Sequence, residues 1–149
     1  GMRVGSLVGP KDFIADIRGT MVSDLGINVI GQRAASAALK TKPEWLPGLL
    51  ETARRNQEII KETIDKIPGA FLPVYPSAAS MMIIDISEHN ANPQDVQDKL
   101  LYEHDIFVRA GNYVSARFGE NFIRVSFSIP TEEVKRFAEA FPKVMQELS

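Results

Sequence analysis

Two arginines stand in settings where a positive charge needs an anion. Arg3 lies in the segment GMRVG, between glycines that let the backbone pass close to a ligand. Arg124 lies in the middle of FIRVSFS, where apolar and polar residues alternate as they do in a half-buried strand. The planar guanidinium group offers paired N–H donors that fit a phosphate or a carboxylate. Both arginines are therefore candidate anion ligands.

Each of these arginines also has a simpler interpretation. A glycine-flanked arginine arises often by chance, which leaves Arg3 open. Arg124 would be satisfied equally by a salt bridge to an acid of this chain, or by water on an open strand face. Arg109, at the end of a strand, is either a second anion ligand or a surface residue. Tyr113 and Arg117, in the loop before the Arg124 strand, fit an exposed loop better than a ligand site.

Composition narrows the classes of function. The 149 residues are 44% hydrophobic and 24% charged, which is typical of one globular domain or of a domain with part of another. The net charge of −2 gives no electrostatic reason to bind nucleic acid or an anionic membrane. The absence of cysteine excludes disulfides, thiolate metal sites and a cysteine nucleophile. The two histidines lack metal-site spacing, so no metal is expected.

Hydropathy predicts no membrane span and no signal peptide. No apolar run reaches the roughly 18 residues that a spanning helix needs. The apolar stretch after Arg3 is short and is broken by Gly5, Gly9 and Pro10. The expected location is therefore the cytoplasm. Gly1 ahead of Met2 is either native or a remnant of tag removal.

The elements around Arg124 follow a recognisable order. The patterns predict a strand over 81–87, a helix over 93–104, strands over 106–110 and 122–128, and a final helix from 131. Thr131 is expected to cap that helix, and Pro142 to kink or shorten it. This order predicts an α+β sandwich, with helices on one face of a small and largely antiparallel sheet.

The first half of the chain is predicted to be mainly helical. A buried strand over 3–8 is expected to precede helices over 11–22, 28–39 and 43–67. The regular part of the longest helix is expected to begin at Pro47, because proline is accepted in a first helical turn. Residues 68–79 contain three prolines and predict an extended connector.

The order and separation of the two arginine motifs resemble the class I/II aminotransferases, the pyridoxal-phosphate (PLP) enzymes of the aspartate aminotransferase type. In that family the arginine of G-x-R-x-G binds the cofactor phosphate, which implies this role for Arg3. The arginine of the last strand binds the substrate α-carboxylate, which implies that role for Arg124. Residues 28–39 resemble the family's Q-x-A-x-x-A-L helix, and residues 103–128 resemble its final block.

The resemblance covers essentially the whole chain and implies its organisation. Residues 1–42 would end the PLP-binding large domain, residues 43–67 would form a linking helix, and residues 68–149 would form the small carboxyl-terminal domain. The implied activity moves an amino group between an amino acid and a 2-oxo acid. The implied assembly is a homodimer with active sites at the subunit boundary.

The departures from the family bear on catalysis. The family's Schiff-base lysine would fall before Gly1, and so would the acid and the aromatic ring that contact the cofactor ring. This chain alone is therefore expected to be inactive and to bind PLP weakly or not at all, and none of its residues receives a catalytic role. The loop after Gly111 lacks the family's Gly-x-x-Phe-Gly pattern, so the substrate amino acid is not implied.

Two other functions stay open. A non-catalytic amino-acid-binding or regulatory α+β module would use Arg124 without PLP, but it leaves GMRVG unexplained. One half of a split enzyme would assemble with a partner chain that carries the lysine. Such a half would show a large exposed apolar surface on residues 1–40.

Overall fold

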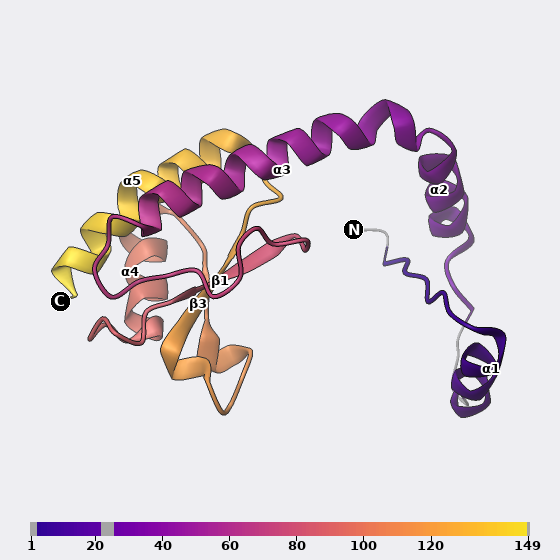
Figure 1. Ribbon diagram of the computed structural model, residues 1–149, viewed down its shortest axis with the longest axis horizontal. Helices are drawn as coiled ribbons and strands as arrows, with labels where there is room; N and C mark the ends of the chain where they lie inside the picture. The colour runs from indigo at the N-terminus through magenta and orange to yellow at the C-terminus, as the bar shows by residue number, and fades with distance from the viewer. Residues whose placement is uncertain (1–2, 22–25, 149) are drawn as a thin grey trace. The chain divides into compact units, whose positions relative to one another are not determined.

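The computed structural model describes residues 3–21 and 26–148. The chain divides into two compact units, residues 1–47 and 48–149, and the boundary falls inside the long helix α3, Lys42–Ile64 (Figure 1). Among these described residues no helix is both long enough and apolar enough to cross a membrane.

The first unit contains α1, Lys11–Thr20, and α2, Val29–Lys40, before the start of α3. The Asn28 side chain caps α2, accepting hydrogen bonds from the backbone N–H groups of Ile30 and Gly31 at 2.9 and 3.4 Å. Both helices were predicted, although Val22, the expected end of the first, lies outside the described residues. The strand predicted over 3–8 is wrong, because the described residues offer this segment no neighbouring strand.

The second unit is built on a three-stranded sheet. Its strands are β1, Met81–Asp85, β2, Arg109–Ala110, and β3, Phe122–Ser126, in the order β1-β3-β2 with both pairs antiparallel. The helices α4, Pro93–His104, and α5, Thr131–Glu147, complete the unit. The predicted order of strand, helix, strand, strand and helix is confirmed, and so is the α+β class.

The core lies on one face of the sheet. Alternate residues of β1 and β3, including Ile84 and Ile123, are buried in one cluster with residues of α3, α4 and α5. Ile60 and Ile64 enter this cluster from α3. The Phe137 and Phe141 rings of α5 stack within it, with centroids 4.9 Å apart. The intervening strand residues therefore lie on the face away from the helices.

Strand β2 is shorter than the predicted strand over 106–110. Asp105 adopts a left-handed conformation, with φ of 55°, and the N–H of Ile106 donates to the carbonyl of Leu100 at 3.0 Å. These residues close the carboxyl end of α4 and are not available for strand pairing.

Three details of the predicted helices differ from the structure, although α5 begins at Thr131 as predicted. Helix α3 begins at Lys42 and contains Pro47 in its interior, although that proline removes one helical hydrogen bond. Helix α5 has Pro130 at its N-cap with no side-chain cap, so Thr131 does not cap it. Nor does Pro142 shorten α5, because the buried residues on both sides of the proline hold the helix through to Glu147.

Buried amides of α3 attach this helix to the sheet. The Asn56 Nδ2 donates to the carbonyls of Phe127 and Ile129 at 2.9 and 2.8 Å. Gln57 bonds both backbone polar atoms of Ser77, donating to its carbonyl at 3.1 Å and accepting from its N–H at 2.7 Å. The second half of α3 is therefore fixed both to the exit of β3 and to the connector before β1.

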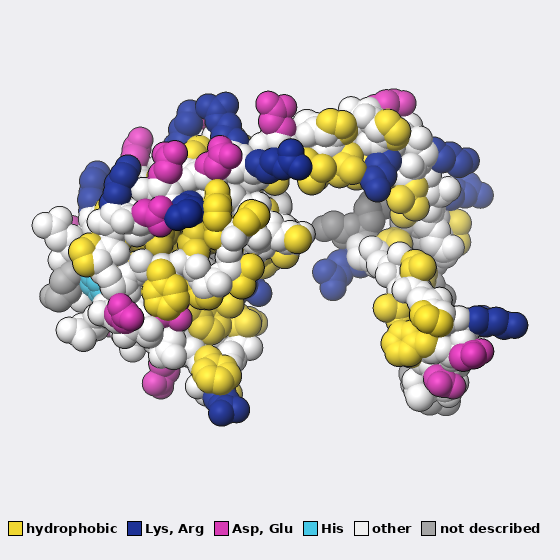
Figure 2. Space-filling model, in the orientation of Figure 1, with side chains coloured by type: hydrophobic (Ala, Val, Ile, Leu, Met, Phe, Trp, Pro, Cys, Tyr) yellow, Lys and Arg dark blue, Asp and Glu magenta, His cyan; other side chains and the backbone are white. Residues whose placement is uncertain are grey.

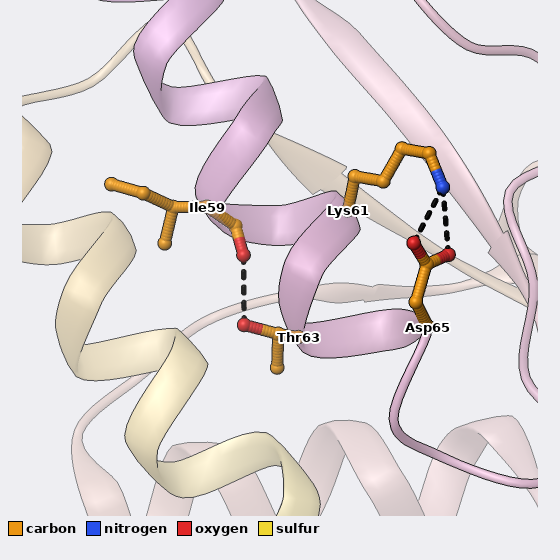
Figure 3. Close-up of polar contacts among 4 residues, drawn as sticks. All are labelled: Ile59, Lys61, Thr63 and Asp65. Atoms are coloured by element: carbon orange, nitrogen blue, oxygen red, sulfur yellow. Dashed lines mark hydrogen bonds and ion pairs between the residues drawn. The ribbon is translucent and has the colours of Figure 1, made fainter.

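The last turns of α3 are held by local contacts (Figure 3). The Lys61 Nζ pairs with both carboxylate oxygens of Asp65, at 2.8 and 2.6 Å, and the Thr63 hydroxyl donates to the Ile59 carbonyl at 2.8 Å. The Lys61 Nζ also lies 5.5 Å from the centroid of the Tyr75 ring in the connector. An exposed ion pair of this kind adds little stability, so the buried amides carry most of the attachment.

Three charged side chains, one lysine and two glutamates, link α4 to the carboxyl end of α5. The Lys99 Nζ of α4 lies 2.8 Å from Glu147 of α5 and 3.0 Å from Glu103. The hydrogen bond from Lys99 lowers the pKa of Glu147, and the hydrogen bonds to Glu147 and Glu103 raise the pKa of Lys99.

The first prediction concerns Asn56. We expect Asn56→Ala to lower the free energy of unfolding by about 1–3 kcal/mol, because it leaves the buried Phe127 carbonyl without its donor. Urea denaturation followed by circular dichroism measures this change. Asn121→Ala removes an exposed amide and is the matched control, with an expected change within about 0.5 kcal/mol. Equal effects of the two substitutions would contradict the proposed attachment.

The second prediction is a pH dependence at Glu147. Because folding lowers the pKa of this carboxyl group, its stabilising effect is present above the ordinary pKa of 4.5 and is lost as the pH falls through the lower folded value. We expect wild type to be slightly more stable than Glu147→Gln at pH 6, and the difference to be smaller at pH 3. Parallel urea titrations at the two pH values measure it. A difference that grows on acidification would contradict the link between Lys99 and Glu147.

Candidate functional site

Three side chains form a row across the open face of the sheet. In the strand register Arg124 of β3 stands opposite Ile83 of β1 on one side and opposite Arg109 of β2 on the other. Directly opposed residues of antiparallel strands point to the same face, with Cβ atoms about 5 Å apart. The neighbours of Arg124 in β3, Ile123 and Val125, are buried towards the helices. The row therefore lies on the face that the helices leave uncovered.

Among the described residues, the two arginines of this row have no anionic partner. Within residues 3–21 and 26–148, every ion pair is made by other side chains, and neither guanidinium donates a side-chain hydrogen bond. A salt bridge to an acid of this chain was the simpler explanation for Arg124, and the described residues contain no such bridge. Like charges placed directly opposite each other destabilise a sheet. An anion bound at this row would relieve that repulsion.

Arg109 is held by aromatic rings. Its guanidinium carbon lies 4.1 Å from the centroid of the Tyr113 ring and 4.8 Å from that of Phe107. The Nε atom is buried without a hydrogen-bond partner in the described part of the chain. Gln97 of α4 fixes this strand end, because its Oε1 accepts from the Ala110 N–H at 2.9 Å. Sequence reasoning left Arg109 and Tyr113 open, since no local pattern reveals that their side chains meet.

The loop that carries Tyr113 depends on two glycines. The carbonyl of Gly111 accepts from the N–H groups of Val114 and Ser115, both at 2.8 Å, and the Gly119 N–H donates to the Ser115 carbonyl at 3.0 Å. A Cβ on Gly111 would lie 2.5 Å from the carbonyl oxygens of Gly119 and Phe122. A Cβ on Gly119 would collide with the backbone of Asn112. The loop closes only because both residues lack side chains.

Arg3 belongs to the first unit, and its surroundings there are open. Its side chain is exposed, its φ is 56°, and it makes no ion pair or side-chain hydrogen bond with the described residues. The first two residues of GMRVG lie outside the described residues. A guanidinium with no partner among the described residues offers paired N–H donors of the kind that suit a phosphate. Across the described ranges, no group of three or more His, Asp or Glu side chains is placed to hold a metal ion.

Comparison with known proteins places this chain in a family. It matches the family Aminotransferase class I and II over residues 1–141. An arginine–pyruvate transaminase of Pseudomonas aeruginosa is 30% identical over 112 residues, which is 74% of this chain and 28% of that protein. An LL-diaminopimelate aminotransferase of Aquifex aeolicus is 28% identical over 142 residues, 93% of this chain and 35% of that protein. The chain thus spans about a third of the length of these relatives.

Solved structures share the fold. The histidinol-phosphate aminotransferase of Sinorhizobium meliloti, in complex with pyridoxal-5′-phosphate, has a TM-score of 0.71 at 24% identity, covering 91% of this chain and 34% of that one. Cystalysin of Treponema denticola has a TM-score of 0.71 at 19% identity, and the match covers 86% of this chain and 32% of cystalysin. The fold is therefore one found in PLP-dependent enzymes. The match over residues 1–141 identifies the chain as a member of the class I and II aminotransferase family.

The loop glycines generate a prediction. We expect Gly119→Ala to destabilise the second unit by about 1–3 kcal/mol, because the new methyl group meets the backbone of Asn112, which cannot rotate away. Thermal and urea unfolding measure this effect. Gly48→Ala is the control, since nothing lies within 4 Å of a Cβ there and alanine favours the helix. Gly119→Ala with unchanged stability would mean that the loop is not closed as described.

Proposed function

We propose that this chain supplies the substrate-carboxylate ligand of a PLP-dependent aminotransferase that moves an amino group between an amino acid and a 2-oxo acid. Arg124 takes this role. The carrying observation is the pair of arginines, Arg124 and Arg109, opposed across β3 and β2 without an anion among the described side chains. Family membership supports the proposal, because the resemblance of the last strand to that of the family implies a carboxylate ligand for its arginine.

The position of Arg124 suits precise orientation of a substrate. Its strand is the middle one, so strands on both sides hold its backbone. The planar guanidinium binds a carboxylate through two parallel hydrogen bonds, which sets the direction of the substrate as well as its position. Arg109 adds a second positive charge beside the same anion. Such fixed positioning lowers the entropic cost of reaching the reactive geometry.

Arg3 is proposed as a ligand of the PLP phosphate, supported by its free guanidinium and by the glycines around it. PLP, when bound, supplies the electron sink that stabilises negative charge on the substrate carbon. We propose that the Schiff-base lysine comes from polypeptide outside residues 1–149, because none of this chain's lysines stands in a matching context. The domain assignment of 1–42, 43–67 and 68–149, the homodimer and the cytoplasmic location remain predictions.

The surface of the first unit supports assembly with further polypeptide. No residue of α1 is buried, and only Gly31 is buried in α2. Large apolar side chains are exposed along this unit, among them Val8, Phe13 and Ile30, and Figure 2 shows hydrophobic side chains gathered around α1. Apolar surface on this scale normally packs against protein. It favours a part of a larger or split enzyme over a self-contained ligand-binding module.

Replacement of Arg124 tests the proposal. We expect Arg124→Gln to weaken binding of pyruvate to the 149-residue chain by about tenfold or more, because a charge-assisted hydrogen-bond pair is lost. Ligand-observed NMR titration measures the dissociation constant. Arg117→Gln removes an exposed arginine that also lacks an ion pair among the described residues, and it should leave binding unchanged. Equal pyruvate affinity in wild type and Arg124→Gln would refute the role of Arg124.

A further inference from the structure

A cavity opens beside Arg124, along the edge of the sheet where β1 lies. It has a volume of about 260 Å³, and its lining includes Pro73, Val74, Met81, Met82, Ile83 and Arg124. Arg124 is the one charged side chain in the lining described. The cavity is smaller than the roughly 300–1,000 Å³ pockets of drug-sized ligands, so it suits a small molecule.

Apart from Arg124, the one polar side chain of the lining is Ser77, and its polar atoms are already engaged. Ser77 completes the lining, and Gln57 occupies both its N–H and its carbonyl. The Ser77 hydroxyl donates to the Met81 carbonyl at 3.1 Å and accepts from the Ala79 N–H at 3.2 Å. A polar or charged group placed against Ser77, away from Arg124, would therefore lose its water without gaining a partner.

The apolar walls are stable and accessible. One wall is the connector, which the buried Gln57 fixes to α3 through Ser77, and the other is strand β1. Three apolar side chains of these walls remain open to solvent: Val74 is 66% exposed, Met81 41% and Ile83 39%. Covering them with an apolar ligand removes apolar surface from water, which favours binding.

We infer that this cavity is the side-chain pocket of the substrate site, and that it selects monocarboxylates with an apolar body. The inference rests on the proposed role of Arg124, which holds the carboxylate at the edge of the cavity. The apolar body of a branched or aromatic 2-oxo acid, or of the matching amino acid, then lies against Val74, Met81 and Ile83. A ligand with a second carboxylate would bury that group in the cavity without a hydrogen-bond donor. A ligand with a cationic side chain would bring its positive charge close to that of Arg124.

A series of 2-oxo acids tests this selectivity on the 149-residue chain. The probes are pyruvate, 4-methyl-2-oxopentanoate and 2-oxoglutarate, titrated while the methyl signals of Met81 and Met82 are followed by NMR. We expect 4-methyl-2-oxopentanoate to bind about tenfold or more tightly than pyruvate, because each buried methylene contributes up to about fourfold. 2-Oxoglutarate should bind no more tightly than pyruvate. Tighter binding of 2-oxoglutarate, or equal binding of all three acids, overturns the inference.

Variants of the walls separate this inference from the proposed function. Ile83→Thr and Val74→Ser should weaken 4-methyl-2-oxopentanoate more than pyruvate, reducing the preference by about threefold or more. Val114→Ser, at an exposed apolar residue outside the lining, is the matched control and should preserve the preference. If binding depends on Arg124 but the wall variants change nothing, the pocket is wrong and the carboxylate role stands. If Arg124→Gln also changes nothing, both proposals fail.

Discussion

The pleat of strand β3 is the constraint on which the candidate site depends. Ile123 and Val125 must enter the core with residues of α3, α4 and α5, so Arg124 between them has to lie on the opposite face. A shift of one residue would bury a charge and expose two core side chains. Asn56 fixes the exit of this strand and Gln57 fixes the connector beside β1. The position of one arginine is thus determined by the packing of the whole second unit.

The face of the sheet that carries Arg124 combines features that lower the stability of the fold. Two arginines oppose each other across neighbouring strands, and the Nε of Arg109 is buried without a partner among the described residues. The aromatic rings of Phe107 and Tyr113 offset part of this cost, because they face the guanidinium of Arg109. Local arrangements that oppose stability are typical of functional sites. Beside them, the cavity at Arg124 presents apolar walls, a combination that matches a small acid with an apolar body.

The first unit raises a different physical question. Its helices bury almost nothing, yet they carry large apolar side chains, and the capped α2 is regular. Helices of this length gain most of their stability from packing an apolar face. The relatives that the chain matches are about three times longer, and the family match runs through this unit. Both observations fit a unit whose core is completed by other polypeptide.

The sequence by itself determined the family, the α+β order of elements from residue 81 onward, and the face of Arg124. The order of motifs and the two-residue period of a strand can both be read directly along the chain. Only the tertiary structure decided that Arg109 stands opposite Arg124 and that the Tyr113 ring packs against the guanidinium of Arg109. It also brought Gly111 and Gly119 into contact. It also decided that residues 3–8 form no strand and that α3 begins at Lys42. The reason is physical: register, pairing partners and close backbone contacts arise between residues far apart in the chain, where no local pattern records them.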